Sequence, residues 1–147
     1  MKKVLCILLG LCLLCVTAGC AEKAGPSTEG DDSFVDLTKL SSTMVYAEVY
    51  NIMAVPTDYL GKTIKAGGVY QANFYEPTGK YYHAVVIADA AACCAQGLEF
   101  EWSGAHTYPD DYPQSGAPIE VTGVFESYEE LGNTYYRLTV EEIEVLG

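Results

Sequence analysis

A pair of adjacent glycines inside a strand-like segment constrains the fold of this chain more than any other feature. Residues 62–72 alternate weakly between apolar and polar side chains, and Gly67 and Gly68 interrupt them. Glycine within a strand is typical of a β-bulge or of a sharp bend in a barrel strand. Further strand-like segments follow as far as Val145. The sequence therefore predicts a mainly β domain whose first long strand bends.

Four further segments have the composition or the alternation of β-strands. They are residues 81–88, 98–102, 119–128 and 134–145. The first is almost continuously apolar, which predicts burial on both of its faces. In the other three, alternation predicts an inward face that consists of Leu98, Phe100, Trp102, Ile119, Val121, Gly123, Phe125, Tyr136, Leu138 and Val140. The acidic pair Glu141-Glu142 breaks the period of the last strand, which predicts a bulge or a change of exposure there.

Five strands with a glycine bend in the first predict a small closed barrel. The opening at residues 59–68 and the ending at residues 135–143 resemble bacterial OB-fold proteins. The resemblance spans about residues 59–146, and in the opening it rests on Tyr59, Gly61, Lys62, Ile64 and Gly68. It implies a small five-stranded OB-like barrel, a fold that serves many functions. A proline-rich loop over residues 103–118 takes the place of the helix that such proteins carry between their third and fourth strands.

One amphipathic helix is predicted before the barrel, over about residues 45–53. Ser41, Ser42 and Thr43 are candidate N-cap residues, and Pro56 prevents the helix from continuing. We expect the helix to pack against the sheet through an apolar stripe that consists of Val45, Tyr46, Val49, Tyr50, Ile52 and Met53. A ligand-stacking role for the two tyrosines of this stripe is the alternative interpretation.

The N-terminus has the pattern of an export signal. Two lysines are followed by the apolar residues 4–16, and small residues then precede Cys20. This order resembles the bacterial lipobox, which implies removal of a signal peptide at residues 1–19 and attachment of a diacylglycerol to Cys20. Thr17 departs from the leucine that usually begins the motif. A signal peptide without lipid is the alternative, and the apolar run is shorter than the ~20 residues that span a bilayer.

Residues 20–33 have no apolar period and are rich in small and acidic side chains, which predicts a flexible tether. Its root-mean-square reach is about 20 Å. Residues 34–147 are then predicted to form a single domain with one core. Together these segments predict an exported protein that is anchored to the bacterial cell membrane through Cys20. Its domain is expected on the extracytoplasmic side.

The chain is strongly acidic, with 8 Lys and Arg residues against 20 Asp and Glu residues. Removal of the signal peptide takes Lys2 and Lys3 away, which gives the mature chain a net charge of −14. Such a charge repels phosphate backbones and anionic headgroups, so nucleic acid is not an expected partner. A basic protein partner or a cation is favoured instead. Improved solubility of an exported domain is the simplest explanation of the charge.

Cys93 and Cys94 form the least generic part of the sequence. Asp89 and Gly97 flank them as candidate residues for the start and the end of a helical turn. The two cysteines have three interpretations: small buried side chains, a strained vicinal disulfide, or metal ligands of a zinc type. In the last case His83 and His106, the only histidines of the chain, are the candidate partners. A Cys-Cys-Ala run also resembles bacterial membrane proteins linked to zinc-regulated transport.

The sequence contains no recognisable catalytic signature, so an enzyme is the least favoured class and catalytic residues are not predicted. The expected function is a membrane-anchored lipoprotein that acts as a binding or assembly module at the cell envelope. One alternative is a metal-handling accessory protein that uses His83, Cys93, Cys94 and His106, with zinc as the cofactor. The other is an envelope redox protein that uses the cysteine pair. Apart from that zinc ion, no cofactor is expected.

Overall fold

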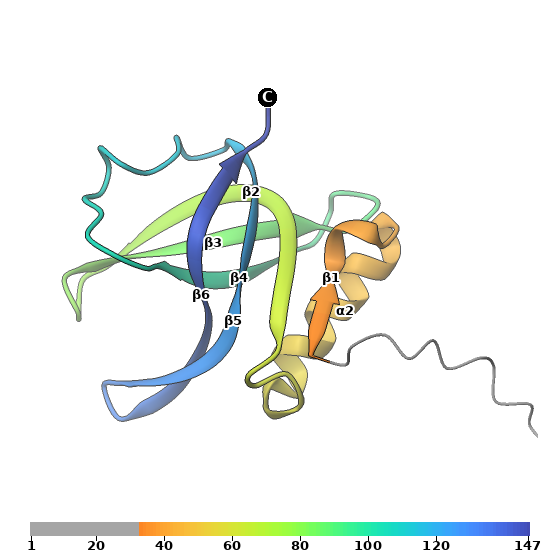
Figure 1. Ribbon diagram of the computed structural model, residues 1–147, viewed down its shortest axis with the longest axis horizontal. Helices are drawn as coiled ribbons and strands as arrows, with labels where there is room; N and C mark the ends of the chain where they lie inside the picture. The colour runs from red at the N-terminus through yellow and green to blue at the C-terminus, as the bar shows by residue number, and fades with distance from the viewer. Residues whose placement is uncertain (1–32) are drawn as a thin grey trace, which may run out of the picture.

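The protein is mainly β, as predicted, in a computed structural model that describes residues 33–147. Residues 33–147 contain one α-helix, two short 3₁₀ helices and six strands (Figure 1). In chain order these are β1 Phe34–Asp36, η1 Leu37–Lys39, α2 Ser42–Ala54, η2 Pro56–Asp58, β2 Thr63–Tyr75, β3 Lys80–Ala88, β4 Ala95–Trp102, β5 Pro118–Glu130 and β6 Asn133–Val145. The predictions of a signal peptide, of Cys20 lipidation and of the tether up to residue 32 lie outside the described residues.

Five of the strands close into a ring, which confirms the predicted barrel. The ring runs β2-β3-β4-β6-β5, and the pairing of β5 with β2 closes it. Every neighbouring pair in the ring is antiparallel except β4 and β6, which are parallel. In this Greek-key arrangement the last strand inserts between the third and the fourth, as in an OB-like barrel. The short strand β1, which the sequence pattern did not indicate, pairs parallel to β2.

Strand β2 bends at the predicted glycines because it belongs to both sides of the barrel. Its first half, residues 63–69, pairs with β5, and its second half, residues 69–75, pairs with β3. At Gly68, a Cβ atom would collide with the backbone carbonyl oxygen of Val86 in β3. The strand can therefore pass from one partner to the other only where a side chain is absent.

The predicted irregularity at Glu141-Glu142 is a β-bulge. Val121 pairs with Ile143 and Gly123 pairs with Val140, so both glutamates lie opposite a single residue of β5. A bulge bends its strand and increases the local twist. Here it brings the strands so close that a Cβ at Gly123 would lie 2.5 Å from the carbonyl oxygen of Thr139.

The core occupies the interior of the barrel and contains the alternating residues that the sequence indicated. Leu98, Phe100, Ile119, Val121, Phe125, Leu138 and Val140 are all buried. Trp102 and Tyr136 are exceptions, because both are only half-buried, and Trp102 is also the last residue of β4. The Trp102 indole N–H donates to the carbonyl oxygen of Glu141 at 3.1 Å. The prediction of burial on both faces of β3 is wrong, since only His83, Val85 and Ile87 on one face are buried.

Helix α2 and the loop over residues 103–117 lie on different sides of the barrel (Figure 1). Ser41 caps the helix by accepting a hydrogen bond from the Met44 N–H at 3.4 Å. Val49 and Ile52 are buried in the common core, but Tyr50 and Met53 are exposed, so the packed stripe is narrower than predicted. The loop, which replaces a helix as expected, packs two tyrosines, Tyr108 and Tyr112, against the core. Over the described residues, no helix is long and apolar enough to cross a membrane.

Candidate functional site

A groove lined by tyrosine and glutamate lies between the hairpin of β2 and β3 and the hairpin of β5 and β6. Two adjoining pockets of about 330 Å³ and 200 Å³ share Tyr82, Glu99 and Tyr135. We call this surface the tyrosine groove and define it by Tyr75, Tyr82, Glu99, Tyr128, Glu130 and Tyr135. These residues come from β2, β3, β4, β5 and β6, and each side chain belongs to the outward row of its strand. The twist of the hairpins turns these outward rows toward a common concave surface.

Hydrogen bonds between strands hold the carboxylates of the tyrosine groove in place. The Tyr128 hydroxyl donates to Glu99 at 2.7 Å. Glu130 accepts from the Tyr82 hydroxyl and forms an ion pair of 3.1 Å with Lys80, so it connects β5 with β3. Burial raises the pKa of the Glu99 carboxyl, whereas the hydrogen bonds from Tyr82 and Lys80 lower the pKa of Glu130. The surroundings therefore favour the ionised form of Glu130 and disfavour that of Glu99, which a nearby cation would stabilise.

Aromatic rings form the remaining walls of the tyrosine groove. Tyr128 stacks on Tyr135 with 5.6 Å between ring centroids, and Tyr75 meets Tyr82 edge to face at 6.3 Å. The Arg137 guanidinium lies 4.7 Å from the centroid of the Tyr128 ring and pairs with Glu101 at 3.0 Å. Aromatic faces beside carboxylates are well suited to cations, which gain both cation–π and charge–charge attraction.

Two strand edges border the tyrosine groove. Over the described residues, residues 80–82 of β3 pair only with β2, because pairing with β4 starts at His83. Residues 133–137 of β6 pair likewise only with β5, because pairing with β4 starts at Leu138. Free strand edges offer backbone N–H and C=O groups to an incoming extended segment.

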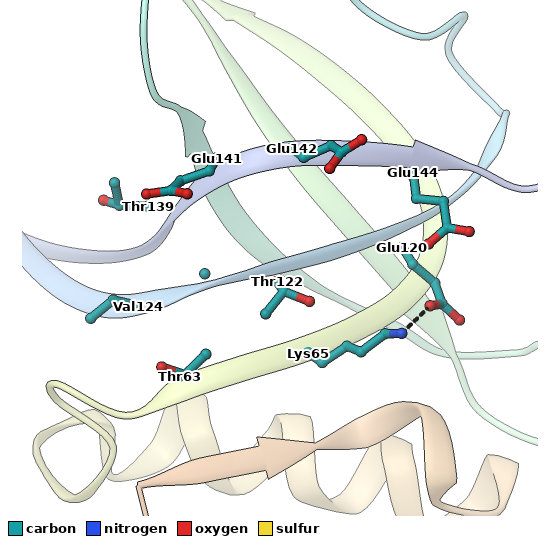
Figure 2. A pocket seen from close by; sticks show the side chains of 10 residues that line it. Thr63, Lys65, Glu120, Thr122, Val124, Thr139, Glu141, Glu142 and Glu144 are labelled. Carbon is teal, nitrogen blue, oxygen red and sulfur yellow. Dashed lines mark ion pairs between the residues drawn. The ribbon is translucent and has the colours of Figure 1, made fainter.

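A second, acidic groove lies over β2, β5 and β6 and has a volume of about 650 Å³ (Figure 2). Glu120, Glu141, Glu142 and Glu144 line it together with Lys65. Lys65 already pairs with Glu120 at 2.7 Å, which raises the pKa of its ammonium group. The bulge directs Glu141 and Glu142 to different positions along the groove (Figure 2). This surface has no aromatic wall, and its carboxylates beyond Glu120 are exposed.

Cys93 and Cys94 lie exposed in the turn between β3 and β4, and both are free thiols. The predicted helical turn is wrong, because residues 89–94 form a non-helical turn and Gly97 lies inside β4. Asp89 nevertheless accepts backbone hydrogen bonds, from Cys93 N–H at 2.9 Å and from Cys94 N–H at 3.4 Å. The Cys93 thiol donates to the same carboxylate at 3.2 Å, and this contact raises the pKa of the thiol.

The structure does not bring the two histidines to the cysteine pair. Within the described residues, the one group of closely placed metal-ligating side chains that contains the cysteines consists of Asp89, Cys93 and Cys94. His83 lies inside the barrel, where its Nδ1 lies 2.7 Å from the Tyr70 hydroxyl. His106 stacks on Trp102 at 3.6 Å, and its Nε2 lies 3.0 Å from the carbonyl oxygen of Ser103.

Sequence reasoning missed the tyrosine groove and the role of Asp89 as a partner of the thiols. A signal for the groove exists, because the outward positions 128, 130 and 135 carry large or charged side chains that can converge across a hairpin. Their convergence with β3 and β4 depends on the closure of the barrel, which spacing alone does not give.

No protein family and no curated protein sequence matches the chain.

Proposed function

We propose that this chain is a lipoprotein anchored at Cys20 whose barrel is a binding module at the extracytoplasmic surface of the membrane. Its ligand would be a basic, extended segment of a partner protein, received in the tyrosine groove. The anchor and the location are supported by residues 1–33, in which two lysines, an apolar run, small residues before Cys20 and a polar tether follow in order.

The single observation that carries the choice of ligand is the convergence of four tyrosines and two glutamates in one groove. Arg137 provides an internal example of the proposed contact, because its guanidinium lies over Tyr128 and pairs with a glutamate. A partner's arginine or lysine would meet Tyr82 or Tyr135 and the carboxylates of Glu99 and Glu130 in the same manner. The two strand edges would bind the backbone of the partner segment.

The charge of the molecule favours this ligand over the other common ligands of small barrels. The mature chain would carry a net charge of −14, which would repel an oligonucleotide. The same field attracts a basic segment and increases its rate of association at low ionic strength. The acidic groove of Figure 2 contributes to this field, but it has no aromatic faces to fix a side chain.

A direct test measures the affinity of the full chain for a lysine-rich peptide and for a matched glutamine-rich peptide. The double variant Glu99→Gln/Glu130→Gln keeps the size of both side chains and removes their charge. We expect it to weaken binding of the lysine-rich peptide at least about tenfold, since each charge-assisted hydrogen bond contributes ~1.5–3 kcal/mol. The glutamine-rich peptide should bind weakly to both proteins.

The matched control is Glu141→Gln/Glu142→Gln, which removes the same charge from the acidic groove. This control should change the affinity by less than about threefold, because exposed charges act over a screened distance. Equal weakening by the two double variants would show general charge attraction and would overturn the tyrosine groove as the site. Equal affinity for the two peptides would overturn the basic ligand.

A further inference from the structure

We propose that Asp89, Cys93 and Cys94 form an exchangeable site for a divalent cation of the zinc class. This inference goes beyond the tyrosine groove and does not depend on it, because none of the three residues lines that groove. It also replaces the four-residue set with His83 and His106 that the sequence suggested. The site lies in the turn between β3 and β4, where one oxygen and two sulfur donors come together.

The distances between the donor atoms fit a tetrahedral zinc ion. Zinc binds thiolate sulfur at ~2.3 Å and carboxylate oxygen at ~2.0–2.2 Å, so tetrahedral angles place two sulfurs about 3.8 Å apart and sulfur and oxygen about 3.5–3.7 Å apart. The Sγ atoms of Cys93 and Cys94 lie 3.8 Å apart. The Cys93 Sγ lies 3.2 Å from Asp89 Oδ2. All three ligand atoms lie within 4.8 Å of one another, so only small rotations would complete the site.

Backbone hydrogen bonds fix the carboxylate in the orientation that binding needs. Asp89 Oδ1 accepts from the N–H groups of Cys93 and Cys94, at 2.9 Å and 3.4 Å, which leaves Oδ2 directed at the Cys93 thiol. The turn is closed by Asp89 N–H to the Cys94 carbonyl at 2.9 Å and by Ala92 N–H to the Asp89 carbonyl at 3.0 Å. Partners of this kind orient metal ligands and raise affinity. The site is therefore ordered before a cation arrives.

The chemistry of the donors points to a zinc-class cation that can be exchanged. Thiolates select borderline and soft cations over magnesium or calcium. On binding, the cation takes the place of the proton on each thiol, so both protons pass to the solvent. Three protein ligands leave the fourth tetrahedral position for water or for a ligand of another molecule. Both cysteines are exposed, so a second molecule can reach that position.

The experiment uses the full chain with Cys6, Cys12, Cys15 and Cys20 replaced by serine, so that Cys93 and Cys94 are the only thiols. The protein is reduced, freed of metal and titrated with Zn²⁺ alone, with proton release as a second readout. Co²⁺ then serves as a spectroscopic probe of thiolate ligation. We expect one equivalent of Zn²⁺ per chain, release of both thiol protons and a cobalt–thiolate absorption band.

Three variants locate the ligands. Cys93→Ser and Cys94→Ser should each abolish the cobalt–thiolate band of a two-sulfur site. Asp89→Asn can still accept the two backbone hydrogen bonds but loses the anionic ligand, and it should weaken Zn²⁺ binding at least about tenfold. His106→Asn is the control and should leave the affinity unchanged.

Three results would overturn the proposal. They are Zn²⁺ binding that survives loss of both cysteines, binding that depends on His106, and a cysteine pair that remains oxidised by intact mass under reducing conditions. None of them affects the peptide affinities that test the tyrosine groove, so the two proposals fail independently.

Discussion

Among single residues, His83 combines deep burial with a titratable ring. It lies on the inward face of β3, stacks on Tyr112 with 4.0 Å between ring centroids, and lies within hydrogen-bond distance of the Tyr70 hydroxyl. Burial lowers its pKa to about 4, because the apolar and aromatic surroundings cannot solvate an imidazolium. His83 therefore belongs to the core, and its ring does not lie with the cysteine pair that the sequence suggested as its partner in metal binding.

The depressed pKa of His83 predicts that this residue destabilises the fold in mild acid. The unfolded chain binds the proton at about pH 6.5, whereas the folded chain binds it only near pH 4. Stability is thus fully present above about pH 6.5, falls as the pH decreases, and reaches its full loss below about pH 4, by up to ~3 kcal/mol. Denaturant unfolding across this range should show the loss.

The variant His83→Asn separates this effect from the titration of the carboxylates. The asparagine side chain can form a hydrogen bond with the Tyr70 hydroxyl but does not become protonated, so the difference from the wild-type free energy of unfolding should shrink as the pH falls. His106→Asn leaves the buried histidine in place and should retain the wild-type dependence. Parallel stability curves for wild type and His83→Asn would contradict the prediction.

At the level of elements, two glycines allow neighbouring strands of the barrel to approach closely. Gly68 lies where β2 passes from β5 to β3, and Gly123 lies beside the bulge of β6. At each position a Cβ would meet a backbone carbonyl oxygen of the neighbouring strand, which cannot move aside as a side chain can. Neighbouring backbones can approach this closely at the two positions only because glycine has no side chain.

Alanine at Gly68 or at Gly123 should therefore destabilise the barrel by ~1–3 kcal/mol, as overpacking does in other cores. Gly97→Ala is the matched control within β4, since its Cβ would lie 3.6 Å from the Cβ of Ala84, an ordinary contact. That control should be neutral or slightly stabilising, because alanine reduces the freedom of the unfolded chain. Thermal and denaturant unfolding of Gly68→Ala, Gly123→Ala and Gly97→Ala would check this. Equal stability of the three variants would show that positions 68 and 123 tolerate a side chain.

The strand elements could be predicted from the sequence because alternation indicates the buried face of a single strand. The glycines likewise indicate where that strand bends or closely approaches its neighbour. The bend at Gly67-Gly68 and the bulge at Glu141-Glu142 are both visible in the local period. Trp102 was placed too deep, because alternation gives the face of a strand but not the distance to its end. The tyrosine groove was missed because β3, β4 and β6 meet there only after the barrel has closed. Convergence of this kind depends on topology, not on local pattern.

On the scale of the whole molecule, the proposed lipid anchor and tether would determine where the acidic barrel lies relative to the membrane. A tether with a reach of about 20 Å would keep the barrel near the membrane without inserting it. The anionic surface of the barrel would then be repelled by anionic headgroups, which leaves its grooves available to a partner in the surrounding solution.

The metal alternative shows the limit of sequence reasoning at this scale. His106 follows Cys94 by 12 positions in the sequence, yet folding places its ring on Trp102 and not at the thiols.

The proposed lipid anchor at Cys20 predicts how substitution of this cysteine changes processing and membrane attachment. If Cys20 carries the lipid, Cys20→Ser should leave the precursor unprocessed or release the mature chain from the membrane. Cys15→Ser is the matched control, because it makes the same substitution at a nearby cysteine of the export signal without touching the residue that would be lipidated. It should be processed and retained like the wild-type protein.

Two attached acyl chains give stable membrane binding at ~0.8 kcal/mol per buried methylene, so the contrast between the two variants should be nearly complete. Fractionation of cells, with the apparent mass of the chain in each fraction, measures it. A Cys20→Ser protein that is still shortened and still found with the membrane would refute the anchor. The barrel would then reach its partner by another route.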